Sequence, residues 1–189
     1  MDEALAFEEP RPVRLTVDDF LLLADAGAFD AYRRTELLEG TIVAISPMGT
    51  RHSLLMTEIG FRLRLALGAL DPALLVLIGP TVTLPPHDAP MPDVVVMRHG
   101  SSRYAAGAAV LLAVEVSTST LRQDLTVKRD IYARGGIAEY WVVDGEGGRL
   151  HQFWAPADGA YAERRVVPLD GPLTSVTLPG LAIDGSGIL

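Results

Sequence analysis

The sequence contains no cysteine and no long hydrophobic run. Without thiols, disulfide bonds and thiolate metal sites are excluded, which agrees with a reducing compartment. The longest apolar runs are too short to span a bilayer. The first twenty residues, MDEALAFEEPRPVRLTVDDF, are acidic and lack the apolar centre of a secretory signal. We therefore expect a cytoplasmic protein without a membrane segment.

The sequence also lacks an excess of positive charge, because its formal net charge is −8. This charge disfavours a protein that coats nucleic acid through a broad basic face. A nuclease remains possible, since an acidic cluster that holds a divalent cation itself adds negative charge. A local basic strip could still steer a phosphate backbone, although solvated surface is the simpler interpretation for most of its candidates. These candidates are Arg33, Arg34, Arg51, Arg62, Arg64, Arg122, Lys128, Arg129 and Arg134.

What is present suits a folded domain of mixed secondary structure. The 189 residues are 49% hydrophobic and 21% charged, which is enough to bury a sizeable core. We expect a loose N-terminal arm over residues 1–15 and a single domain over residues 16–189. Hydrophobic periodicity and turn residues predict helices over 17–26, 51–70 and 121–134. They predict strands over 36–38, 41–45, 74–84, 93–97, 110–116, 139–143, 149–154 and 161–167, with weaker strand character over 175–178.

Two acidic residues and a lysine occupy unusual positions between Met91 and Lys128. Asp93 opens the apolar run VVVM, and Glu115 interrupts the run VLLAVEV. A carboxylate inside a buried strand is costly unless it is paired or binds a cation. Mg²⁺ prefers oxygen ligands and needs only one or two protein carboxylates when substrate oxygens complete its shell. The two acids therefore predict a metal site, where Lys128 would orient water or stabilise charge on a phosphate.

Each of these residues also has a simpler interpretation. Asp93 follows a proline and could cap a loop, and Glu115 could face solvent on an edge strand. Asp124 and Lys128 have the i, i+4 spacing of an ordinary surface ion pair on a helix.

The motifs around these residues resemble those of the Uma-two family of restriction endonucleases, in the PD-(D/E)XK nuclease superfamily. The matching segments are Pro92-Asp93, VEVSTST from Val114, DLTVKRDIYARGG from Asp124 and EYWVVD from Glu139. The upstream ELLEGTIV and the pair His52-Ser53 also match the family's N-terminal pattern. The resemblance covers residues 17–154.

The resemblance implies an α/β fold with a restriction-endonuclease-like core. Its mixed central sheet would be flanked by helices, with an N-terminal helix-hairpin and a C-terminal β extension. It also implies Mg²⁺ or Mn²⁺ as cofactor and a homodimer. The implied substrate is nucleic acid, which we expect to be DNA. Carried over by position, Asp93 and Glu115 are metal ligands and Lys128 is the catalytic lysine. Possible accessory residues are Glu39, His52, Ser117 and Asp124.

The resemblance also identifies one departure from the superfamily pattern. The usual lysine lies two residues after the acid, on the same strand, and that position is Ser117 here. A lysine would have to come from the following helix. The leading hypothesis is a Mg²⁺-dependent endonuclease that hydrolyses phosphodiester bonds by in-line attack of water. Its alternatives are a nuclease-fold binding or regulatory module that no longer cuts, and a hydrolase of another phosphoester.

Overall fold

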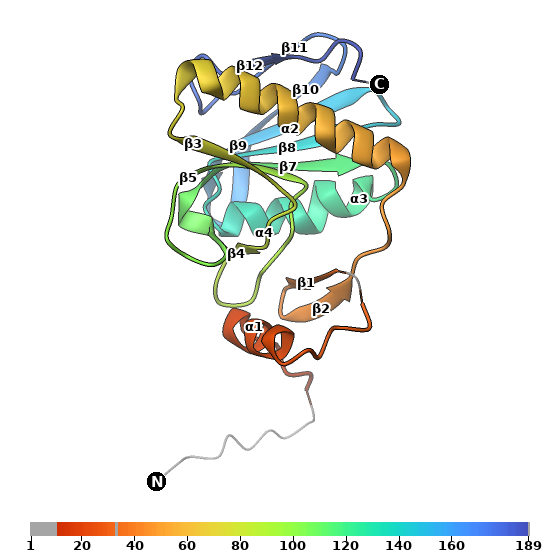
Figure 1. Ribbon diagram of the computed structural model, residues 1–189, viewed down its shortest axis with the longest axis vertical. Helices are drawn as coiled ribbons and strands as arrows, with labels where there is room; N and C mark the ends of the chain where they lie inside the picture. The colour runs from red at the N-terminus through yellow and green to blue at the C-terminus, as the bar shows by residue number, and fades with distance from the viewer. Residues whose placement is uncertain (1–10, 33, 189) are drawn as a thin grey trace.

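A mixed six-stranded sheet forms the centre of the protein, as seen in a computed structural model that describes residues 11–32 and 34–188 (Figure 1). The strand order is β10-β9-β8-β7-β5-β3. Within this sheet β7 and β8 run parallel, and the other neighbouring pairs are antiparallel. The strands are β3 (Leu74–Ile78), β5 (Val94–Arg98), β7 (Val110–Ser117), β8 (Glu139–Asp144), β9 (Arg149–Ala157) and β10 (Ala160–Pro168). The expected α/β architecture with a mixed central sheet is confirmed.

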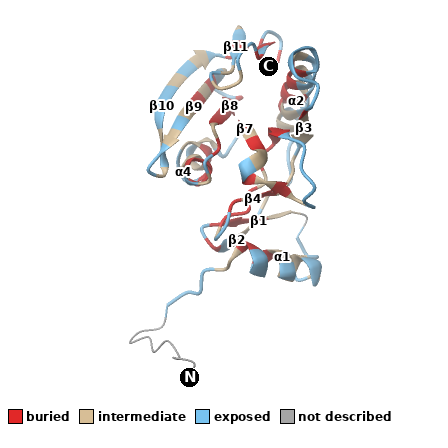
Figure 2. Cartoon of the chain, turned by 90° about the vertical axis from the view of Figure 1, so that its left-hand side faces the viewer, coloured by how far each residue is buried: buried red, intermediate tan, exposed pale blue. Residues whose placement is uncertain are grey.

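Helices cover both faces of this sheet, so that its middle strands are buried (Figure 2). One face packs against α2 (Thr50–Leu70), through a stripe of buried residues at every fourth position: Leu55, Ile59, Leu63 and Leu67. The other face packs against a continuous helical segment over residues 121–134. It consists of α3 (Leu121–Gln123), a π-helical turn η2 (Asp124–Lys128) and α4 (Arg129–Arg134). No helix in the described part of the chain is both long and apolar enough to cross a membrane.

The segment over residues 121–134 is also the crossover between the parallel strands β7 and β8. Parallel neighbours cannot be joined by a tight turn, and a helix that crosses the sheet is the usual connection. The helical segment therefore begins shortly after the end of β7 that carries Glu115 and Ser117. This connection keeps its first turns close to that end of the sheet.

The N-terminal elements form a smaller unit beside the sheet (Figure 1). The helix α1 (Val17–Asp25) begins at a capping box, in which Thr16 and Asp19 exchange hydrogen bonds. A hairpin follows, made of β1 (Thr35–Leu38) and β2 (Thr41–Ala44). Two short parallel strands, β4 (Val82–Thr83) and β6 (Ala105–Ala106), and the 3₁₀ turn η1 (Gly107–Ala109) complete this side. Most of the arm expected over residues 1–15, and Arg33, lie outside the described residues.

Two strand predictions were wrong: one strand is shorter than predicted, and the other is absent from its predicted position. The strand expected over 74–84 is broken at Gly79, which has a φ of +58° and whose N–H donates to the carbonyl of Asp93. The strand expected over 175–178 is absent. Instead, β11 (Pro172–Thr174) pairs with β12 (Ala182–Asp184), and residues 175–177 lie between them in an irregular turn.

This irregular turn wraps a buried carboxylate on β8. Glu139 is fully buried and accepts hydrogen bonds from the Ser175 hydroxyl at 2.6 Å, the Val176 N–H at 3.0 Å and the Thr177 N–H at 2.9 Å. The indole of Trp141 also donates to it, at 2.6 Å. Because backbone donors of the turn point at the carboxylate, they are not available for a β ladder. Glu139 therefore anchors the C-terminal segment to the central sheet.

Replacing Glu139 by alanine should destabilise the fold strongly. The change leaves several buried donors without an acceptor, and we expect a loss of about 3–5 kcal/mol in the free energy of unfolding, measured by urea titration. The matched control is Glu163→Ala on the exposed strand β10, which should change stability by no more than about 0.5 kcal/mol. Equal effects of the two changes would contradict the anchoring role.

Candidate active site

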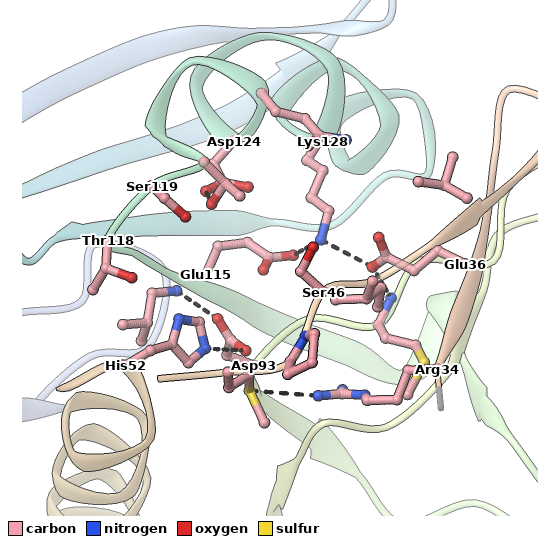
Figure 3. Close-up of a pocket in the computed structure, with 18 of the residues that line it drawn as sticks. Arg34, Glu36, Ser46, His52, Asp93, Glu115, Thr118, Ser119, Asp124 and Lys128 are labelled. Carbon is pink, nitrogen blue, oxygen red and sulfur yellow. Dashed lines mark hydrogen bonds and ion pairs between the residues drawn. The ribbon is translucent and has the colours of Figure 1, made fainter. Parts of the chain in front are cut away.

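A pocket of about 260 Å³ lies where the hairpin β1–β2, the start of α2, strands β5 and β7 and the 121–134 helix meet (Figure 3). Its wall is dominated by charged side chains from segments that are far apart in the sequence. They are Arg34, Glu36, His52, Asp93, Glu115, Asp124 and Lys128. Asp93, Glu115 and Lys128, predicted as the central site residues, are therefore brought together.

Strand pairing places the two predicted metal ligands side by side. Val94 of β5 pairs with Val114 of β7, so Asp93 and Glu115 lie one residue beyond this pair on the two antiparallel strands. Successive side chains alternate between the faces of a sheet, and both acids point to the face covered by the 121–134 helix. Both are buried, and the Asp93 carboxylate accepts a 2.7 Å hydrogen bond from the N–H of Val116.

Lys128 reaches the same pocket from the π-helical turn η2. Its Nζ donates to Glu115 Oε1 at 3.0 Å and to Glu36 Oε1 at 2.9 Å, and the residue is 7% exposed (Figure 3). The interpretation of Lys128 as a surface ion-pair partner of Asp124 is therefore wrong. π-helical turns are rare and occur frequently at functional sites. The helix thus brings an ammonium group to Glu115 without a lysine at position 117 of the strand.

Glu36 is the site residue that the sequence did not identify. It lies on β1, is 3% exposed, and accepts hydrogen bonds from Lys128 and from the N–H of Met91 at 2.7 Å. The available signal was the same as for Glu115, an acid within an apolar strand.

The expectation that Glu39 is an accessory residue of the site is wrong. Glu39 occupies the hairpin turn with a φ of +52°, and its carboxylate bonds to Arg134 at the surface, 3.0 Å away. It does not line the pocket. The turn conformation directs this side chain away from the site, whereas the strand directs Glu36 into it.

The other accessory candidates lie in or beside the pocket. His52, in the first turn of α2, contacts Asp93, with 3.0 Å between its Nε2 and Oδ1. Asp124 is buried in the pocket wall and accepts a 2.6 Å hydrogen bond from Thr120. Ser117 is buried just behind the wall, with its hydroxyl 3.4 Å from that of Thr120. Its contacts make it a support for this corner of the pocket.

Charge in the pocket is unbalanced, because four carboxylates outnumber two basic groups, the ammonium of Lys128 and the guanidinium of Arg34. Burial raises the pKa of Glu115 well above its usual range, the charge of Lys128 opposes this shift, and Asp93, Asp124 and Glu36 add to it. Burial likewise raises the pKa of Asp124. Burial alone would lower the pKa of Lys128, but the charges of Glu115 and Glu36 outweigh it and raise that pKa, so Lys128 stays charged.

Tyr132, one helical turn beyond Lys128, belongs to the same network. It is fully buried, and its hydroxyl donates to Glu115 Oε1 at 2.7 Å. Burial first, and then the charge of Glu115, raise the pKa of this phenol, so it remains a neutral donor. Oε1 of Glu115 is thus held by Tyr132 and Lys128, and Oε2 has no hydrogen-bond partner among the described residues.

This donor set fits a hard divalent cation. Glu115 offers a free carboxylate oxygen, Asp93 lies beside it, and the surplus of negative charge favours a cation. No group of three or more histidine, aspartate or glutamate residues with metal-site geometry occurs within residues 11–32 and 34–188. Mg²⁺ does not need such a cage, because it retains water and takes substrate oxygens as ligands.

A family model named Uma2, described as "Putative restriction endonuclease", matches residues 17–185. The chain belongs to the Uma2 family. This match covers the hairpin with Glu36, both acid-bearing strands and the helix with Lys128, so the whole pocket lies within the Uma2 region. The resemblance noted in the sequence is confirmed.

A solved structure supports the same fold. The chain is similar to a protein from Anabaena variabilis ATCC 29413, described as a putative nuclease belonging to DUF820, with a TM-score of 0.70 and 16% identity. The similarity covers 94% of this chain and 97% of that one. At this identity the comparison shows a shared fold. No curated protein matches the chain.

The crowded acids predict an unusual dependence of stability on pH. Because the pKa of Glu115 is raised in the folded state, that state holds a proton which the unfolded state releases above about pH 4.5. This residue should therefore destabilise the fold increasingly as pH rises from 4.5 towards the raised pKa. We expect the free energy of unfolding of the wild type to fall relative to that of Glu115→Gln as the pH rises above about 4.5, because the variant has no proton to lose at this position.

Thermal unfolding across this pH range would measure the effect. Glu39→Gln makes the same substitution at an exposed acid and should change the free energy of unfolding by less than about 0.5 kcal/mol throughout. The interpretation fails if Glu115→Gln and the wild type lose stability in parallel as the pH rises.

Proposed function

We propose that this Uma2 protein is a Mg²⁺-dependent endonuclease that hydrolyses phosphodiester bonds in DNA. The observation that carries the proposal is the position of Lys128, whose Nζ lies 3.0 Å from Glu115 in the pocket that also contains Asp93. An acid pair and a buried ammonium group are the elements that phosphodiester hydrolysis requires. The family description as a restriction endonuclease supports the choice of DNA.

Asp93 and Glu115 would hold the metal ion. Bound there, Mg²⁺ or Mn²⁺ would polarise a phosphate oxygen and lower the pKa of an attacking water. The two acids are already fixed in orientation without it. Val116 and His52 hold the two oxygens of Asp93, and Lys128 and Tyr132 hold one oxygen of Glu115. Such fixed ligands need little rearrangement on binding.

Lys128 would act as a positive charge and not as a base. The pKa of Lys128 is raised above its ordinary value, so the ammonium group keeps its proton at neutral pH. An ammonium group has three donors, and Glu36 and Glu115 accept from two of them. The third is available to a phosphate oxygen or to the attacking water. Glu36 thereby positions Lys128, and the ammonium stabilises the charge that develops on the phosphate.

The catalytic interpretation is favoured over a binding module that no longer cuts. That alternative rests on the absence of a lysine at position 117 and on the net charge of −8. The first ground is weakened because the helix brings Lys128 into contact with Glu115 instead. The proposal includes a homodimer, because one pocket of this size accepts one strand, and both strands of a duplex must be cut by a restriction enzyme.

Removing either acid should abolish metal binding and cleavage. We expect Asp93→Ala and Glu115→Ala to lose measurable Mn²⁺ affinity in calorimetry, and to cut a labelled DNA duplex at least ~100-fold more slowly than the wild type. Glu39→Ala, an acid on the same hairpin as Glu36 but outside the pocket, is the control and should retain full activity. Cleavage at the wild-type rate by Glu115→Ala would refute the assignment.

Lys128 should be needed for rate and not for metal affinity. In Lys128→Ala the acids remain, so Mn²⁺ should bind with an affinity no lower than in the wild type, whereas the single-turnover cleavage rate should fall by ~10²–10³-fold. Metal affinity and turnover are measured on the same preparations. Metal binding by the wild type without turnover on duplex, single-stranded DNA or RNA would contradict the enzymatic proposal and favour the binding module.

A further inference from the structure

A second pocket, of about 410 Å³, adjoins the candidate active site. It lies between α1, the segment leading into β1, and the loops that contain Thr81 and Tyr104. Two residues, Arg34 and Met91, line both pockets, so the two pockets are neighbours that share these side chains. A substrate strand that occupies the first pocket would pass beside Arg34 to reach the second.

The second pocket is unusually aromatic. Four of its eleven lining residues are aromatic, compared with 6% of the whole chain, and they are Phe20, Phe29, Tyr32 and Tyr104. Phe20 and Phe29 stack on each other with their ring centres 5.4 Å apart, and both pack into the small N-terminal core. Packing of that core accounts for these two rings and leaves the two tyrosines unexplained.

The tyrosines present ring surface to the pocket. Tyr32 is 57% exposed, and Tyr104 is half-buried. Within residues 11–32 and 34–188, neither hydroxyl has a hydrogen-bond partner, whereas those of the interior Tyr132 and Tyr140 do. Large aromatic side chains left open beside a cavity are typical of ligand sites.

The wall that carries Tyr104 is fixed in place. Arg103 donates to both carboxylate oxygens of Asp25 on α1, at 2.9 and 3.0 Å. Its guanidinium also lies 5.0 Å from the centre of the Tyr104 ring. These two contacts link the loop to α1 and place the Tyr104 ring beside the second pocket.

Arg34 provides a cation at the junction of the two pockets. It forms no salt bridge with any residue in the described part of the chain, and its Nη1 contacts only the sulfur of Met48, at 3.6 Å. A thioether is a weak acceptor, so the guanidinium can exchange this contact for a stronger one. Arginine binds phosphate through two parallel donors, and a phosphate at the junction would receive them.

We propose that the second pocket binds an unpaired nucleobase of the substrate, with Arg34 on the phosphate that connects this nucleotide to the active site. An aromatic pocket next to an unpaired guanidinium matches the planar base and the adjoining phosphate of one nucleotide. A base stacked inside a duplex cannot enter such a pocket, so the substrate must be single-stranded or have this base turned out of the helix. The inference rests on the proposed function and specifies its substrate.

Binding of short oligonucleotides tests the proposal independently of cleavage. The probe is a single-stranded oligodeoxynucleotide with phosphorothioate linkages, which resist hydrolysis, and one 2-aminopurine, whose fluorescence is quenched on stacking. Titrations are made in Mg²⁺ with the full chain. Tyr32→Ala should weaken binding by about 5- to 100-fold and remove the quenching, as expected for the loss of one base–aromatic stack. Tyr32→Phe keeps the ring and should behave as the wild type.

Two controls test whether the effect of Tyr32→Ala depends on a base in the second pocket. Phe61→Ala removes an aromatic residue of similar exposure, 59%, from the outer face of α2 and should leave affinity unchanged. An oligonucleotide with an abasic site in place of 2-aminopurine should bind the wild type and Tyr32→Ala equally well. The proposal is overturned if Tyr32→Ala binds the 2-aminopurine probe like Phe61→Ala, or if the wild type does not bind it.

The outcomes also separate this inference from the proposed function. Metal-dependent cleavage with no effect of Tyr32→Ala on probe binding would refute the base pocket and leave the nuclease in place. Quenching that depends on Tyr32, without cleavage by the wild type, would support the base pocket and refute the nuclease.

Discussion

A buried ammonium group among carboxylates is the interaction on which the candidate site depends. Lys128 donates to Glu36 and Glu115, and thereby joins the N-terminal hairpin, a central strand and the crossover helix. Charges buried at this depth are tolerated only when paired and hydrogen-bonded. Four acids outnumber the ammonium of Lys128 and the guanidinium of Arg34, so the pocket retains a surplus of negative charge that a divalent cation would relieve.

The sheet and the crossover helix explain how such a site can be built. The pairing of β5 with β7 brings Asp93 next to Glu115, and alternation directs both acids to one face. The parallel pairing of β7 with β8 requires a crossover connection, and in this fold the crossover helix lies on that same face. Lys128, on this helix, therefore lies close to the acids.

Much of this arrangement could be predicted from the sequence. Asp93 and Glu115 stood out because an acid within an apolar strand needs a partner, and the helix with Lys128 followed from its hydrophobic periodicity. Glu36 was missed and Glu39 preferred although the predicted strands over 36–38 and 41–45 place the hairpin turn correctly at residues 39 and 40. Which side chains of the hairpin face the pocket depends on how the hairpin packs against the rest of the fold, and this contact leaves no local pattern in the sequence. The break at Gly79 and the turn over 175–177 depend on hydrogen bonds to Asp93 and Glu139, which are distant in sequence.

The separation of the site residues along the chain has a consequence for synthesis. Glu36 and Lys128 are 92 residues apart, so their contact closes a long loop of the chain. The entropy lost in closing such a loop must be offset by other interactions, among them the pairing of the strands between the two residues. While the chain emerges from the ribosome, its acids are present before the lysine exists. A molecule in which these strands have not paired therefore lacks the assembled pocket.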